Sequence, residues 1–286
     1  MIQLVECPRD AMQGIKKFIP TAVKAEYINS LLKVGYHTID FGSFVSPKAI
    51  PQMADTKDLV KQLDLRDSPS KLLAIIANER GAIEASEFEE ITYLGYPFSI
   101  SETFQLRNTN STIEESFERV KRIQEICTST KKELVVYISM GFGNPYGDPY
   151  SKEIVENWIE KLSKLDVNIF SLSDTVGVAQ ADTISYLFDN LIPSFPGIEF
   201  GAHLHTAPHN WKEKIDCAFE HDCRRFDTAI FGYGGCPMAK DDLIGNMPTE
   251  HFVNYFGIKT IGNNFNIEAF ENSLRIAKKV FSLSKF

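Results

Sequence analysis

The residues of this sequence that could do chemistry are concentrated after position 200. An apolar run there ends in the triplet His-Leu-His at residues 203–205. Alternate residues of a β-strand share one face, so both imidazoles would point the same way, as two ligands of one metal ion must. A glycine-rich turn then presents Cys236, and Asn246 follows it. This combination of groups predicts a metal-assisted reaction at a carbon centre.

Further polar residues follow other apolar runs, and their distribution predicts one shared site. Asp10 would add a carboxylate ligand, and Arg9 beside it could stabilise a developing oxyanion. With His203, His205 and Asn246, Asp10 completes a set of imidazole and oxygen donors that suits Mg²⁺, Mn²⁺ or Zn²⁺. The residues in such positions are Arg9 and Asp10 after the first run, Asp40 and Ser43 after the second, Ser101, Glu102 and Asn108 after the fourth, and Asp174 after the sixth.

Cys236 lies between Gly-Tyr-Gly-Gly and a proline, which indicates a loop rather than a core element. Free cysteines are mostly buried and inert, but a loop thiol above a metal site is a candidate acid. We favour an acid over a nucleophile because no oxyanion hole with a histidine base is visible. Asp40 could simply cap a turn, and Asp174 either starts a turn or supports a ligand. The remaining cysteines are interpreted as packing residues: Cys7, Cys127, Cys217 and Cys223.

The elements that must position these residues alternate between short apolar runs and longer amphipathic segments. Eight such units without a Pro/Gly/Ser-rich linker predict a single (β/α)₈ barrel, one catalytic domain over residues 1–286 with an extra C-terminal helix. The active site of such a barrel lies at the C-terminal ends of its strands. Segments 43–53, 104–112 and 140–149 are predicted loops. Predicted strands are Ile2–Val5, His37–Phe41, Lys71–Ile76, Pro97–Ser101, Glu133–Met140, Asn168–Leu172, Glu199–His203 and Arg225–Ala229, and predicted helices include Thr21–Val34, Thr112–Ser129, Lys152–Leu165 and Ile267–Ser282.

Bulk composition excludes several classes of protein. The 286 residues are 43% apolar, enough for a large core, and the net charge of -8 argues against a nucleic-acid-binding surface. No run approaches the roughly 18 apolar residues of a membrane-spanning helix. The opening residues MIQLVECPRD lack the composition of a signal peptide. Five scattered cysteines without a CxxC motif suit a reducing compartment, so we expect a cytoplasmic protein.

Motifs along essentially the whole chain carry a family resemblance. The segments PRDAMQ, SFVSPKAIPQMAD, SETF, RNTNSTIEESF, SDTVGV, HLH, GGCP and GNMPTE occur in this order. With them the sequence resembles the 3-hydroxy-3-methylglutaryl-CoA lyase family, metal-dependent barrel enzymes related to isopropylmalate and homocitrate synthases. The resemblance implies cleavage of an acyl-CoA thioester, 3-hydroxy-3-methylglutaryl-CoA, to acetoacetate and acetyl-CoA with Mg²⁺ or Mn²⁺, a step of leucine degradation. A homodimer is expected only by family analogy.

The same resemblance assigns roles to individual residues. It implies an enolate-stabilising role for Arg9 and a catalytic role for Cys236. It places Asn108 on a substrate loop, and Asp174 and Glu250 on positions that support the site. The implied metal ligands are Asp10, His203, His205 and Asn246.

The chain departs from the family pattern near the expected substrate. Asp40 replaces a glutamate and Thr112 a serine, which is expected to change the space around the acyl portion. Ala11 replaces a glycine, and Thr206 an aspartate. The segment from Cys236 to Asn246 carries one extra residue, and one residue is missing before Arg9. These departures leave the implied metal and cysteine chemistry intact and affect the preference for the acyl group.

In the implied reaction a base, either Asp10 or His203, removes the proton of a tertiary hydroxyl group. The C2–C3 bond then breaks to a ketone and a thioester enolate, whose oxygen Arg9 stabilises and whose carbon Cys236 protonates. The alternatives are a condensing acyltransferase of the same barrel family and a lyase of a different 3-hydroxyacyl-CoA. The cysteine in GGCP favours the lyase.

Overall fold

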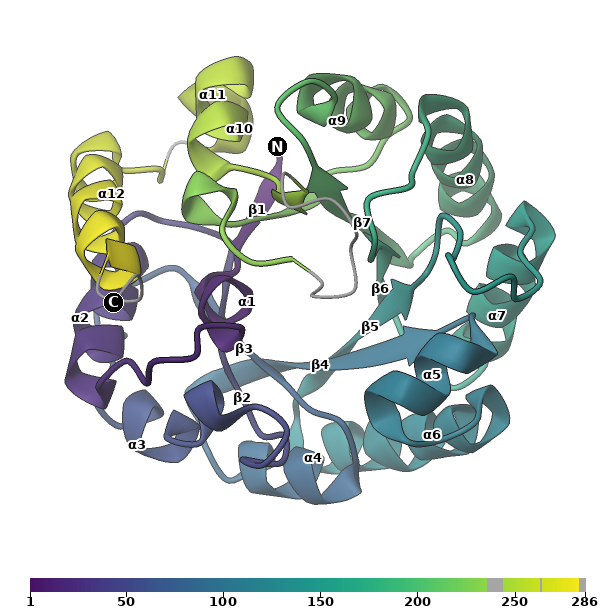
Figure 1. Ribbon diagram of the computed structural model, residues 1–286, viewed down its shortest axis with the longest axis horizontal. Helices are drawn as coiled ribbons and strands as arrows, with labels where there is room; N and C mark the ends of the chain where they lie inside the picture. The colour runs from purple at the N-terminus through teal and green to yellow at the C-terminus, as the bar shows by residue number, and fades with distance from the viewer. Residues whose placement is uncertain (236–243, 263, 283–286) are drawn as a thin grey trace.

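The computed structural model describes residues 1–235, 244–262 and 264–282. Eight parallel strands form a closed barrel, because each strand pairs with its neighbours in sequence and β1 pairs with β8. Figure 1 shows these strands at the centre, surrounded by helices. The predicted (β/α)₈ fold is therefore confirmed. The strands are β1 (Gln3–Glu6), β2 (Thr38–Ser43), β3 (Lys71–Ile75), β4 (Ile91–Ser99), β5 (Glu133–Ser139), β6 (Ile169–Asp174), β7 (Glu199–Thr206) and β8 (Arg225–Thr228).

The helices form an outer layer around the strands. The final helix, α12, packs against α2, and the rings of Tyr27 and Phe281 meet edge to face with their centroids 6.0 Å apart. Among the described residues no helix combines the length and apolar character needed to cross a membrane. The helices are α1 (Pro8–Gln13), α2 (Thr21–Leu32), α3 (Thr56–Val60), α4 (Glu79–Ser86), α5 (Glu102–Thr109), α6 (Ile113–Thr130), α7 (Lys152–Ser163), α8 (Ala181–Ser194), α9 (Trp211–Glu220), α10 (Thr249–Phe256), α11 (Ile258–Ile261) and α12 (Ile267–Ser282), with 3₁₀ turns η1 (Pro51–Met53) and η2 (Ile230–Gly232).

A two-residue strand, β9 (Gly245–Asn246), joins the sheet beside the barrel's mouth. It pairs antiparallel with the end of β7, so that Asn246 lies opposite His205 and Gly245 opposite Thr206. This short ladder fixes the position of Asn246, although that residue is far from β7 in sequence.

The barrel interior is divided between an apolar and a polar side. Alternate residues of β3 to β6 form a small apolar cluster separate from the main core, consisting of Leu73, Tyr93, Val135, Tyr137 and Ile169. The facing strands β7 and β8 contribute His203, Arg225 and Asp227 instead, and the ring of Tyr137 meets that of His203 edge to face. Polar groups thus extend from the mouth of the barrel into its interior.

Two element predictions were wrong. Strand β4 begins at Ile91, six residues before the predicted start. The prediction placed the start too late because this nine-residue segment contains Gly95 and Pro97, residue types that are typical of turns. Residues 104–109 were predicted as loop but belong to α5, whose first turn is capped by the Ser101 hydroxyl accepting from Phe104 N at 3.3 Å. The predicted helix start at position 112 is confirmed by a capping box.

Candidate active site

Three predicted metal ligands converge at the C-terminal ends of the strands. Asp10, His203 and His205 each offer one ligand atom, and these atoms lie within 4.8 Å of one another. Strand β7 places both histidines on the same face. Asp10 lies in the first turn of α1, which begins directly after β1 with a proline at its first position. The barrel therefore brings together residues about 190 positions apart in sequence.

Asn246 adjoins this group through its side-chain amide. Its Nδ2 donates to Asp10 Oδ2 at 2.6 Å and to the carbonyl oxygen of Tyr233 at 2.9 Å. Gly234 makes this approach possible: its φ is +91°, and a Cβ there would lie 2.7 Å from Asp10 O and from Asn246 Nδ2. The glycine-rich turn is thus required by close packing against the candidate ligands.

The charge states of Asp10 and His205 suit a divalent cation. Burial would raise the pKa of Asp10, but the nearby Arg9 and the two histidines lower it to about 2, so its side chain is a carboxylate at neutral pH. Burial and the neighbouring His203 lower the pKa of His205 to about 4, which keeps its imidazole neutral and able to ligate. Within the described part of the chain, the buried His205 Nδ1 has no hydrogen-bond partner. The donor set therefore fits a metal ion of the predicted kind.

Arg9 is held in one orientation beside these ligands. Its Nε donates to Asp40 Oδ1 and Oδ2 at 3.2 and 3.1 Å, and its Nη2 donates to Oδ2 at 2.6 Å. Its Nη1 donates to Asp10 Oδ1 at 3.0 Å and to Gln13 Oε1 at 2.9 Å. Burial raises the pKa of Asp40 to about 6, although Arg9 opposes the shift. Asp40 therefore positions the guanidinium, and these contacts fit a supporting role better than the alternative of a simple turn cap.

Two predicted supporting residues contact the surroundings of the ligands. Asp174 Oδ2 accepts from Lys214 Nζ at 2.6 Å, and the same ammonium donates to the carbonyl oxygen of His205 at 2.8 Å. Asp174 Oδ1 also accepts from Ala179 N, so the residue both organises a turn and supports the strand that carries the histidines. Glu250 Oε2 accepts from Phe231 N at 3.0 Å, at the turn that follows β8.

The other predicted site residues are not part of this cluster. Asn108 lies exposed on α5, and Thr112 caps α6 through its hydroxyl group. Ser43 is buried at the end of β2, where its Oγ has no partner in the described chain. Cys236 lies outside the described residues.

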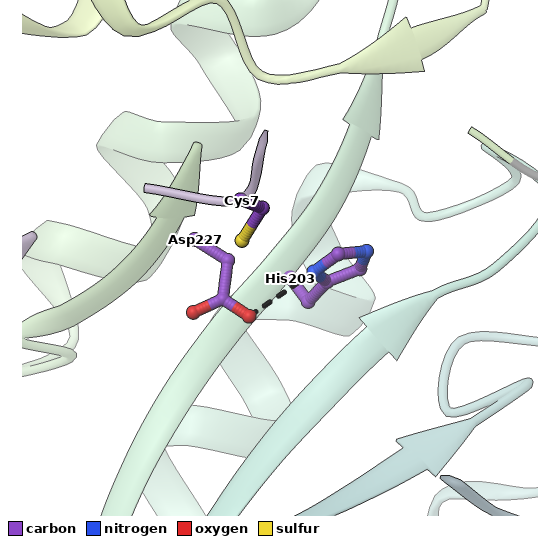
Figure 2. Close-up of side chains that lie close together, drawn as sticks. All are labelled: Cys7, His203 and Asp227. Carbon is purple, nitrogen blue, oxygen red and sulfur yellow. Dashed lines mark hydrogen bonds and ion pairs between the residues drawn. The ribbon is translucent and has the colours of Figure 1, made fainter. Parts of the chain in front are cut away.

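Sequence analysis missed several residues that contact the candidate ligands: Gln13, whose Nε2 donates to Asp10 Oδ1 at 2.6 Å, Lys214 and Asp227. Asp227, on β8, approaches His203 with its Oδ2 3.1 Å from Nδ1 (Figure 2). Cys7 completes a second close group with these two residues. Burial raises the pKa of the Cys7 thiol well above its usual value, which fits a packing role. The local signal for Asp227 was weak, because β8 reads Arg-Phe-Asp-Thr and its alternation of charged and other residues does not single out the carboxylate.

Comparisons with known proteins agree with this geometry. Residues 2–275 match the family model described as HMGL-like. The chain is 31% identical over 266 residues to the mitochondrial hydroxymethylglutaryl-CoA lyase of Mus musculus, covering 91% of this chain and 80% of that protein. It is 30% identical over 264 residues to hydroxymethylglutaryl-CoA lyase YngG of Bacillus subtilis, covering 91% and 86%. Among solved structures, an HMG-CoA lyase from A. baumannii in complex with coenzyme A and 3-methylmalate aligns with a TM-score of 0.90 and 28% identity, over 99% of this chain and 92% of that one.

Proposed function

Because the chain belongs to the HMGL-like family, we propose that it is a divalent-metal-dependent lyase that cleaves 3-hydroxy-3-methylglutaryl-CoA to acetoacetate and acetyl-CoA. The observation that carries this proposal is the convergence of ligand atoms from Asp10, His203 and His205 within 4.8 Å, with the Arg9 guanidinium beside them. The similar proteins named above are lyases of this thioester, and one of them was solved with coenzyme A.

Asp10, His203, His205 and Asn246 would hold the metal ion, which we propose to be Mg²⁺ or Mn²⁺ because a carboxylate and an amide oxygen complete the donor set. When bound, the ion lowers the pKa of the substrate's tertiary hydroxyl group and orients it. Of the two candidate bases, Asp10 is the one we propose as the proton acceptor, because a carboxylate that ligates through one oxygen keeps a second oxygen free, whereas a ligating neutral imidazole has no lone pair left. Loss of its proton lets the C2–C3 bond break, with the electron pair passing into the thioester enolate.

Arg9 is suited to stabilise the enolate oxygen. A guanidinium has five N–H donors in a fixed plane. In the described chain, Asp40, Asp10 and Gln13 engage the Nε hydrogen, one Nη2 hydrogen and both Nη1 hydrogens. The remaining Nη2 hydrogen is left for the substrate. A donor fixed before the reaction stabilises developing charge without reorganisation. Cys236 then gives its proton to the enolate carbon, which yields acetyl-CoA, and the proton taken from the hydroxyl group restores the thiol through solvent.

The test is turnover of purified protein that has been stripped of metal with a chelator. We expect no cleavage of 3-hydroxy-3-methylglutaryl-CoA until Mg²⁺ or Mn²⁺ is added, after which mass spectrometry detects acetoacetate and acetyl-CoA in equal amounts. Acetyl-CoA with a panel of 2-keto acids serves as the control for condensation, and no product is expected. Full turnover by the stripped protein, or no cleavage of any 3-hydroxy-3-alkyl thioester with metal present, would reject the proposed function.

A further inference from the structure

We propose that Asp227 is a positioning residue for the metal site: it accepts a hydrogen bond from Nδ1 of His203 and so leaves Nε2 as the ligand atom. This inference rests on the proposed metal site. An ionised carboxylate can only accept hydrogen bonds. The contact of 3.1 Å between Asp227 Oδ2 and His203 Nδ1 therefore places the ring proton on Nδ1. Metal-binding histidines commonly use a carboxylate in this way to fix the tautomer and the ring orientation.

The barrel sets this contact through two neighbouring strands. Gly201 of β7 lies opposite Arg225 of β8 in the parallel ladder, and two residues further along each strand are His203 and Asp227. Both side chains consequently point into the barrel from adjacent strands. Asp227 is only 3% exposed. Backbone pairing, rather than a loop, determines how the carboxylate meets the ring.

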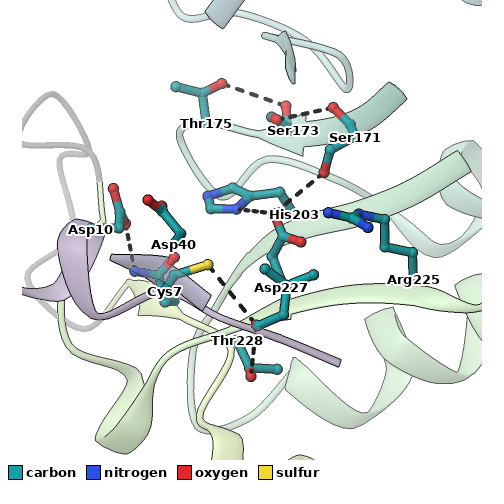
Figure 3. A network of polar contacts seen from close by, with 12 residues as sticks. Cys7, Asp10, Asp40, Ser171, Ser173, Thr175, His203, Arg225, Asp227 and Thr228 are labelled. Atoms are coloured by element: carbon teal, nitrogen blue, oxygen red, sulfur yellow. Dashed lines mark hydrogen bonds and ion pairs between the residues drawn. The ribbon is translucent and has the colours of Figure 1, made fainter. Parts of the chain in front are cut away.

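His203 is shared by two groups of side chains. It forms one close group with Asp10 and His205, and another with Asp227 and Cys7. Figure 3 shows the His203 ring with Asp227 on one side and the carboxylates of Asp10 and Asp40 on the other. Because Nδ1 is engaged by Asp227, Nε2 is the nitrogen that remains for the group containing Asp10.

The surroundings of Asp227 argue against a purely structural ion pair. Arg225 lies two residues earlier on the same strand, but its Nη1 donates to Glu199 Oε1 at 3.0 Å, and its Nε and Nη2 have no hydrogen-bond partner among the described residues. Asp227 Oδ1 also has no hydrogen-bond partner among the described residues. The hydroxyl group of Ser171 donates to Asp227 Oδ2 at 3.5 Å. Among the described residues, the hydrogen bond with His203 is thus the shorter of the two side-chain hydrogen bonds of Asp227, whose carboxylate is costly to bury.

The experiment compares Asp227→Asn and Asp227→Leu with the unchanged protein. Long-range ¹H–¹⁵N correlation spectra of metal-free, histidine-labelled protein report the tautomer of each ring, and His203→Gln assigns the signal. We expect Nδ1–H in the unchanged protein and loss of that single tautomer in Asp227→Leu. Titration calorimetry with Mn²⁺ should show affinity reduced about 10- to 100-fold in both variants. Cys7→Ala, next to the same ring, is the matched control and should bind Mn²⁺ within about twofold of the unchanged protein.

Circular dichroism and thermal unfolding establish that the variants fold. If Asp227→Leu does not fold, the isosteric Asp227→Asn still provides the test. An Nε2–H tautomer in the unchanged protein, or unchanged Mn²⁺ affinity in a folded variant, would overturn the inference. If Mn²⁺ binding depends on Asp227 as expected but no thioester is cleaved, the inference stands and the proposed lyase activity fails.

Discussion

Glu6, the last residue of β1, allows a test of how a buried carboxyl group changes the stability of the protein with pH. Its side chain is 0% exposed. Oε1 accepts from Ile230 N at 2.9 Å and Oε2 accepts from the Thr249 hydroxyl at 2.6 Å. Burial raises the pKa of this carboxyl from 4.5 to about 8, although both hydrogen bonds oppose the shift. The perturbation is Glu6→Gln, which keeps the size of the side chain and supplies a donor and an acceptor without charge.

The direction and size of the effect follow from proton linkage. Between about pH 4.5 and pH 8 the folded protein holds the Glu6 proton and the unfolded chain has lost it, so the free energy of unfolding falls as pH rises. One pKa unit corresponds to about 1.36 kcal/mol, which gives a loss of about 5 kcal/mol by pH 8. Below pH 4.5 this contribution is fully present. Glu6→Gln should avoid the loss, because its amide stays neutral in both states.

Urea denaturation from pH 5 to pH 9 measures this difference. Groups other than Glu6 titrate in both proteins, so subtracting the two stability curves isolates its contribution. We expect similar stabilities near pH 5 and a gap that widens in favour of Glu6→Gln up to about pH 8. Glu250→Gln, which removes a neighbouring and less buried carboxyl, is the control and should not reproduce the gap. Parallel curves for the unchanged protein and Glu6→Gln would refute the reasoning.

Three further predictions concern the candidate active site. His205→Ala should lower Mn²⁺ affinity and turnover together, measured by calorimetry and product formation; normal turnover would remove His205 from the ligand set. Cys236→Ala should fold and bind metal but turn over about 10²- to 10⁴-fold more slowly, the range for one acid–base group. A rate equal to that of the unchanged protein would leave the thiol only a packing role. Asp40→Glu should move Arg9 and change the ratio of kcat/KM between 3-hydroxy-3-methylglutaryl-CoA and its analogues about 10- to 200-fold, while metal affinity changes less. Equal ratios for both proteins would show that Asp40 does not set specificity.

The sequence predicted the parts of this protein that depend on local periodicity. Alternating apolar runs identified eight strands, and the spacing of His203 and His205 placed both rings on one face before their partners were known. The start of β4 was misplaced because a glycine and a proline inside a buried strand carry the same local signal as a turn.

The contacts of Asp227, Lys214 and Asp40 could not be predicted in the same way. Each joins residues on different elements, and the distances depend on the register of neighbouring strands and on the position of helices. The strand that carries Asp227 also carries Arg225, and its local sequence gives no indication of which residue will face either charge. Which side chains meet depends on the register of strands in the closed sheet. A short stretch of sequence carries no information about that register.

The antiparallel pairing of β9 with the end of β7 has a consequence for how this enzyme can change over evolution. Asn246 is placed opposite His205 by the backbone, and the Thr206 hydroxyl donates to the carbonyl oxygen of Asn246 at 3.4 Å. Because backbone pairing sets this position, side chains near the substrate can change under selection for new acyl groups while Asn246 and His205 stay in register.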